Sequence, residues 1–253
     1  CDIIVIYGII FYIGGNNMFK NKDSMFSNNS SKYGNLLTVI LIVSIVAIVG
    51  IIIFIGVRIY NKYHVEKGAA AAVSQFENIV SSDNNANDPN NTNGVGNITG
   101  IADIDETGDS SEIKKSSDGK TYYKGYEVVA TIQIPTIKLK YPILEKVTKK
   151  SLETAVAWLY GPGLNKVGNN VIIGHNYRNG TMFSNVKNLK NGDKIYITDE
   201  SGQKVKYSVY KIYRTTGDDA SYMTRDTKGK REISLSTCTD DSKARTIVWA
   251  VEE

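Results

Sequence analysis

The sequence predicts a mostly β fold, a closed or nearly closed β-barrel, preceded by one transmembrane helix. From Tyr122 onward, short runs rich in Val, Ile, Tyr and Thr are bounded by Gly, Asn, Asp or Pro. Few helical patterns interrupt these runs, and many short strands with few helices are typical of barrels. A long uncharged apolar stretch lies far upstream. The β-rich part has about 130 residues, which is the size of one domain.

Seven runs read as strands because β-branched and aromatic residues dominate them. They are Tyr126–Ile134, Ile137–Leu144, Asn170–Gly174, Lys194–Thr198, Lys204–Thr215, Glu232–Thr237 and Thr246–Val251. Two helices are expected between them. Ser151–Leu159 begins with a cap-like Ser-x-Glu, and Met182–Leu189 places its apolar residues on one helical face.

The transmembrane helix is predicted at Leu36–Val57, a stretch that contains no charged residue. A helix of this length extends roughly 33 Å, enough to cross a hydrocarbon core of about 30 Å. A buried core helix is the less favoured alternative for so long an apolar run. A cleaved signal peptide would have an apolar region of only about 7–15 residues. We therefore interpret the stretch as an uncleaved signal anchor.

The chain is expected to have four parts, one of which is the anchor itself. Residues 1–35 are expected to be a cytoplasmic segment, in which Met18 is a plausible start and residues 1–17 lie upstream of it. Residues 58–120 are expected to form a juxtamembrane helix and then an acidic tether rich in Asn, Asp, Ser and Gly, a composition that disfavours a packed core. Residues 121–253 form the predicted barrel.

Composition excludes several classes of protein. The formal net charge is +4, which is too mild to indicate a nucleic-acid partner, and none is expected. Cys1 and Cys238 are far apart in the sequence, so a disulfide scaffold is excluded. The chain has no CxxC motif and no Cys/His cluster. We therefore expect no metal and no cofactor.

Three residues of the predicted barrel could perform acyl transfer. His175 and Cys238 each end a predicted strand, and Arg245 begins the last one. A thiolate can attack an acyl carbonyl, and an imidazole can protonate the leaving amine and later deprotonate the incoming one. A guanidinium can hold the peptide or stabilise the oxyanion. By residue type alone, a buried structural cysteine and a hydrogen-bonded structural histidine remain the commoner interpretation.

The local sequence around these residues resembles the sortase family. Leu235–Cys238 reads LSTC and is followed by Arg245, which is similar to the sortase signature TLxTC…R, with Ser234 at the first Thr. Gly174–Leu189 reads GHNYRNGTMFSNVKNL and resembles the sortase histidine motif. The histidine motif is class B-like, whereas the compact spacing to the cysteine is similar to classes A, D and E. The resemblance covers about half of the chain.

The resemblance implies a membrane-anchored cysteine transpeptidase with an eight-stranded barrel. Sortases cleave a C-terminal sorting motif, commonly LPxTG-like, and transfer the acyl group to an amine of a cell-wall precursor or a pilin. Cys238 then matches the nucleophile, His175 the general acid and base, and Arg245 the substrate-holding arginine. Such work is extracellular, which places the catalytic domain outside a membrane that the chain crosses once. The loop Thr215–Arg231 is expected to determine which motif is bound.

Two other functions fit the sequence less well. An L,D-transpeptidase would carry an HGC-like motif with arginine two positions later, whereas Arg245 follows Cys238 by seven. A catalytically degenerate, membrane-tethered binding domain would keep the barrel without the chemistry. The presence of all three polar residues argues against that alternative.

Overall fold

The computed structural model describes residues 30–86, 113–117 and 119–253. The chain divides after Gly56 into two compact units, of which the second comprises Val57–Glu253. The expected cytoplasmic segment before residue 30 and the Asn-rich centre of the expected tether, 87–112, lie outside the described residues.

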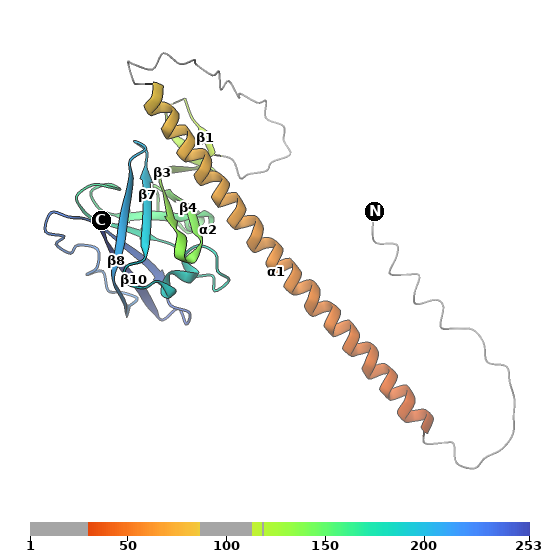
Figure 1. Cartoon of the computed structure of the whole chain (residues 1–253). Coiled ribbons are helices and arrows are strands. Elements are labelled where there is room, and N and C mark those ends of the chain that lie inside the picture. The colour runs from red at the N-terminus through yellow and green to blue at the C-terminus, as the bar shows by residue number, and fades with distance from the viewer. Residues whose placement is uncertain (1–29, 87–112, 118) are drawn as a thin grey trace, which may run out of the picture. The chain divides into compact units, whose positions relative to one another are not determined.

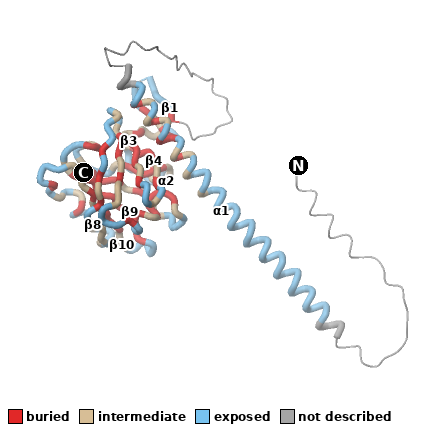
Figure 2. Tube along the Cα trace, viewed as in Figure 1, coloured by how far each residue is buried: buried red, intermediate tan, exposed pale blue. Residues whose placement is uncertain are grey.

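The first long element is the helix α1, Ser30–Ala86. Its large apolar side chains between Leu36 and Ile55 are 48–68% exposed. By length and composition, α1 is the one helix among the described residues that could cross a membrane. Figure 2 shows this exposure as a continuous pale-blue tube along the segment. The expectation of an apolar helix at Leu36–Val57 is therefore met.

Eight strands close into the barrel, as the resemblance implied (Figure 1). Their order is β3-β4-β5-β6-β9-β10-β8-β7, and β7 pairs with β3 to close the ring. The remaining strands β1 and β2 extend the sheet from β3. The bounds are β1 Ile113–Lys115, β2 Thr121–Tyr123, β3 Tyr126–Ile134, β4 Leu139–Leu144, β5 Val156–Tyr160, β6 Gly168–Ile173, β7 Lys194–Asp199, β8 Lys204–Thr216, β9 Arg231–Cys238 and β10 Ala244–Glu252.

Two of the pairings are parallel, and one of them positions the candidate site. β4 pairs in parallel with β5, and β6 pairs in parallel with β9. Because β6 and β9 run the same way, the carboxyl ends of both strands meet at one edge of the barrel.

The barrel interior is the main hydrophobic core. Every barrel strand contributes to it, and most do so through alternate residues; examples are Ile132, Ile172, Leu235 and Val248. Such alternation is expected when one face of each strand points inward.

The second half of α1 also packs into this core. Ala69, Ala72, Val73, Phe76 and Val80 are at most 5% exposed, and their spacing places them on one helical face. Nearby, the Glu77 carboxylate accepts hydrogen bonds from Gln133 Nε2 at 2.7 Å and Thr198 Oγ1 at 3.2 Å. The packed unit thus begins well before residue 121.

The predicted helix Ser151–Leu159 is wrong in its second half. Helix α2 is Lys149–Thr154, and Val156–Tyr160 is the strand β5. The helix starts earlier because Thr148, not Ser151, is the cap, and the two side chains form a capping box. β5 is extended because it fills the place between β4 and β6 in the barrel.

The other predicted elements are found with small shifts. The expected helix at Met182–Leu189 is a 3-10 helix, η2, at Phe183–Asn188. A further 3-10 turn, η1, covers Pro135–Ile137. The expected tether is shorter at both ends, because α1 continues to Ala86 and β1 begins at Ile113.

Candidate active site

Cys238 and Arg245 face each other on neighbouring strands. Cys238 is the last residue of β9, and its Cα partner on the antiparallel strand β10 is Arg245. Directly opposed residues of an antiparallel pair have Cβ atoms about 4.5–5.5 Å apart and point to the same face. The tight turn between the strands therefore brings the arginine beside the free thiol.

His175 follows β6, the strand on the other side of β9. Ile173 pairs with Ser236, so His175 and Cys238 each lie two residues beyond the last parallel pair. Gly174 N donates to Ser236 O at 3.3 Å, and Thr237 Oγ1 donates to Gly174 O at 2.8 Å. The histidine therefore leaves its strand at the same barrel edge as the cysteine. Both residues are half-buried.

Asn176 joins the histidine loop to the cysteine, a role that sequence reasoning missed. Its Nδ2 donates to Cys238 O at 3.0 Å and to Asp240 Oδ1 at 2.9 Å. The hydrogen bond from Lys187, followed by that from Asn176, lowers the pKa of the Asp240 carboxyl. The residues next to His175 on both sides are thus bonded to the cysteine strand. Only the GHN motif itself could have indicated this residue.

Gly174 explains how closely the histidine loop packs. A Cβ at this position would lie 2.8 Å from Val156 Cγ1 and 3.0 Å from the Phe183 ring. Real Cβ atoms do not approach carbon so closely, so only glycine fits between β5 and η2. The loop returns to η2, where Phe183 N donates to His175 O at 3.1 Å.

The candidate residues share the outer face of the barrel with a small second apolar cluster. Val171, Tyr222 and Ile247 form its buried centre, and Ile173, Tyr213, Met223 and Trp249 pack against it. Tyr222 comes from the loop 217–230 between β8 and β9, and Ser236 Oγ donates to its hydroxyl at 3.3 Å. Arg245 Nε donates to Gly217 O of the same loop at 3.0 Å. The loop therefore borders the candidate site.

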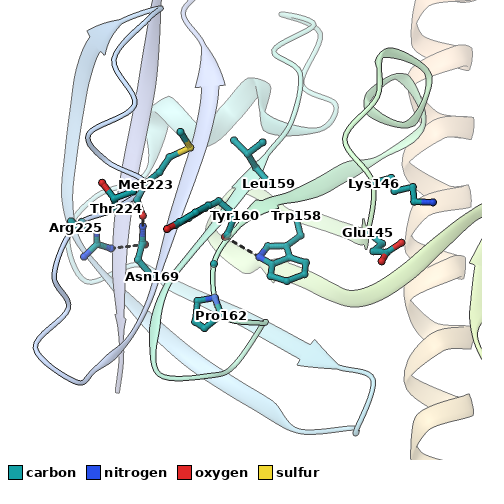
Figure 3. Close-up of a pocket in the computed structure, with 11 residues that line it drawn as sticks. Glu145, Lys146, Trp158, Leu159, Tyr160, Pro162, Asn169, Met223, Thr224 and Arg225 are labelled. Carbon is teal, nitrogen blue, oxygen red and sulfur yellow. Dashed lines mark hydrogen bonds between the residues drawn. The ribbon is translucent and has the colours of Figure 1, made fainter.

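A cleft of about 680 Å³ opens between this loop and β5 (Figure 3). Met223, Thr224 and Arg225 line one side, and Trp158 and Tyr160 line the other. It begins at the level of Asn169, near the start of β6, and therefore lies toward the opposite end of that strand from His175.

The described residues contain no group of three His, Cys, Asp or Glu side chains able to hold a metal ion. The chemistry this edge can perform rests on a thiol, an imidazole and a guanidinium. That set is suited to nucleophilic acyl transfer.

A family model described as a sortase domain matches residues 132–253. The domain formed by residues 132–253 belongs to the sortase family. The matched range contains His175, Cys238 and Arg245 and all barrel strands from β4 onward.

Two sortase relatives and one solved structure are similar to this chain. Sortase A of Bacillus anthracis is 34% identical over 121 residues, which are 46% of this chain and 56% of that protein. Sortase A of Streptococcus agalactiae is 27% identical over 137 residues, 49% of this chain and 52% of that protein. The chain thus spans about half the length of these relatives. A lid mutant of sortase A from Corynebacterium diphtheriae is 33% identical, with a TM-score of 0.46 over 50% of this chain and 70% of that one.

Proposed function

We propose that the chain is a cysteine transpeptidase that cleaves a C-terminal, LPxTG-like sorting motif of secreted surface proteins. It transfers the acyl group to an amine of a peptidoglycan precursor or a pilin. The observation that supports this most strongly is the register at one barrel edge. Cys238 is opposite Arg245 across β9 and β10, and the strand leading to His175 runs parallel on the other side.

The reaction has two halves. The Cys238 thiolate adds to the carbonyl carbon of the motif's Thr, and the bond between Thr and Gly breaks as His175 protonates the leaving Gly amine. This leaves a thioester on Cys238. The acceptor amine then gives up a proton to His175 and attacks the thioester, which forms the new amide and frees the thiolate.

Arg245 is suited to hold the peptide or the oxyanion of each tetrahedral intermediate. Its Nε is bonded to Gly217 O, and its two terminal nitrogens have no hydrogen-bond partner among the residues that the structure describes. A planar fork fixed at Nε presents its remaining donors in a defined direction. Donors held in place before the reaction stabilise developing charge without reorganising.

The proposed location is the cell membrane, crossed once by Leu36–Val57, with the barrel outside. The motif and the acceptor are both extracellular in this proposal, so the thiol must be as well. The exposed apolar half of α1 supports an anchor.

The decisive experiment uses the full chain in detergent with an LPxTG-type peptide. Mass spectrometry should detect an adduct on Cys238 equal to the peptide portion ending at Thr. Adding an amine should release that portion as a new amide. The Cys238→Ala variant is the control and should form no adduct. Peptide binding without any adduct in the unmodified chain would favour the degenerate binding domain instead.

A second experiment tests the orientation. In cells stripped of their wall, a membrane-impermeant thiol reagent should label the unmodified protein and not the Cys238→Ala variant. A permeant reagent serves as the positive control. Equal labelling of the unmodified protein and the variant by the impermeant reagent would place Cys1 outside and the barrel on the inner side of the membrane, which would contradict the proposal.

A further inference from the structure

The loop 217–230 is attached to the outer face of the barrel at three places. Gly217 is bonded to Arg245, and the Tyr222 hydroxyl is bonded to Ser236, two residues before Cys238. Asn169 Nδ2 donates to the carbonyl oxygens of both Tyr222 and Met223, at 2.9 Å each. The first two attachments lie beside the candidate site, and the third lies near the start of β6.

The third attachment is completed by a buried arginine of the loop itself. The Arg225 side chain is 11% exposed, and its Nη1 is paired with the Glu232 carboxylate, which is 9% exposed. Arg225 Nη1 also donates to the Tyr210 hydroxyl at 3.0 Å, and Nη2 donates to Asn169 Oδ1 at 3.0 Å. Figure 3 shows the guanidinium directed at Asn169 along the wall of the cleft.

The Arg225 guanidinium thus contacts four strands of the barrel. Asn169 lies on β6, Glu232 on β9 and Tyr210 on β8, and the Arg225 Cζ lies 4.4 Å from the centre of a Trp249 ring on β10. Desolvation lowers the pKa of Arg225, as expected for a charge removed from water. A planar fork that stacks on an aromatic ring has one orientation that satisfies all of these contacts.

A buried ion pair contributes little net stability compared with apolar side chains, because both charges lose their hydration. It does restrict geometry, since any displacement of the loop would leave Glu232 buried without its partner. We therefore expect these contacts to fix the position of the loop 217–230 and to add little to the stability of the barrel.

We propose that Arg225 is a positioning residue that holds the loop 217–230 at its distance from the barrel face. It thereby sets the place of Tyr222 and Gly217 beside Cys238 and Arg245, and the width of the cleft against β5. Its effect on peptide binding rests on the proposed transpeptidase function. Its effect on the loop does not.

The test compares three variants of the full chain in detergent. Arg225→Met leaves Glu232 charged and buried, so this variant can also lose stability. Arg225→Met combined with Glu232→Gln removes both charges and keeps the fold testable. Arg231→Met is the matched control, because it breaks the Arg231–Glu252 ion pair between β9 and β10 and leaves the loop contacts intact.

We expect both Arg225 variants to raise KM for an LPxTG-type peptide at least tenfold, with kcat changed less than threefold. The rate of Cys238 alkylation by iodoacetamide should be unchanged, because the thiol and His175 do not move. Amide hydrogen exchange should become at least tenfold faster in residues 217–226 and remain unchanged in β6 and β9. Arg231→Met should alter none of these quantities.

Three outcomes would overturn the proposal. The double variant could fold and keep both the exchange rates of the loop and the KM. The loop could exchange faster while KM stays constant, which would make Arg225 irrelevant to the peptide. The control Arg231→Met could match the Arg225 variants, which would indicate a general loss of stability. If the unmodified chain forms no Cys238 adduct, the proposed transpeptidase function fails. Unchanged hydrogen exchange in the loop of the Arg225 variants would still refute the role of Arg225 in holding the loop.

Discussion

The inner and outer faces of β6, β9 and β10 differ although the same strands form both. On β9, Ile233 and Leu235 point into the barrel core, and Ser234 and Ser236 point outward. All four are at most 1% exposed. The inner side chains are buried among apolar neighbours. Of the outer ones, Ser236 donates to Tyr222 of the loop, and Ser234 donates to Asn169 and accepts from Arg225 of the loop at 3.5 Å.

The difference teaches that burial has two causes in this barrel. Inside, burial follows from apolar packing, and a smaller side chain leaves a cavity. Outside, the loop 217–230 covers both a small apolar cluster and the polar side chains of β9, and hydrogen bonds as well as apolar packing decide the arrangement. Substitutions on the inner face should therefore change stability, and those on the outer face near residue 238 should change activity.

Cys238→Ala should give the largest effect on the outer face. Removing the thiol leaves a small side chain at a half-buried position, so the melting temperature should change little. Peptide cleavage should be abolished, because no nucleophile remains. If mass spectrometry detected more than a trace of cleavage, Cys238 would not be the nucleophile, and the outer face would not be the site of the reaction.

His175→Ala should lower kcat by about 10²–10⁴, the usual contribution of one proton-transfer group. The far-ultraviolet circular dichroism of the variant should match that of the unmodified protein, because the loop is held through Gly174 and Asn176. A loss below tenfold would mean that His175 only supports the loop.

Leu235→Ala sharpens the comparison from the inner face. Leu235 is fully buried in the barrel core, so its truncation should lower the free energy of unfolding by about 2–5 kcal/mol. At a temperature where the variant is folded, kcat/KM should stay within about threefold of the original. Denaturant unfolding and peptide kinetics measure the two quantities. If Leu235→Ala lowered activity without lowering stability, the inner face would affect activity as the outer face does, and the difference between the two faces would be refuted.

Arg245→Lys should lower kcat/KM at least roughly tenfold, a smaller loss of activity than Cys238→Ala or His175→Ala gives. Lysine keeps the charge but lacks the fork that donates to Gly217 and to a bound peptide at once. The melting transition should be retained, and iodoacetamide should still alkylate Cys238. Transpeptidation at the original rate would show that charge alone suffices, and the forked role would be refuted.

The barrel was predictable because most of its strands are runs of β-branched and aromatic residues that can be recognised one by one in the sequence. β3 was predicted at its observed bounds, and β8, β9 and β10 were found within two residues at each end, since β-branched runs ended by polar turns leave little choice. β5 was missed because VAWLY follows a short helix without a turn residue and continues the apolar pattern of that helix. β1 and β2 have only three residues each, too few for a periodicity to be recognised.

For the candidate site, the three reactive residues could be found from the sequence, but the residues that hydrogen-bond to the surrounding loops and position them could not. Cys238, His175 and Arg245 stand at predicted strand ends, and the spacing of the last two strands brings Arg245 to Cys238. Asn176, Asn169 and Arg225 are polar residues in loops or at a strand start. The hydrogen bonds that join Asn169 to Tyr222, Ser234 and Arg225, and Asn176 to Cys238, connect residues 53–65 positions apart in sequence, so only the folded chain reveals them.

The strand order has a consequence for how the protein is made. β10 follows both β8 and β9 in sequence, yet it lies between them in the ring. A nascent chain that ends anywhere before Ala244 leaves β8 and β9 without the strand that joins them. Such long-range closure is slow compared with local helix formation, so α1 can form long before the barrel does. Cys238 consequently has no Arg245 beside it until β10 has been synthesised, and a chain that stops before this strand carries the thiol without its site.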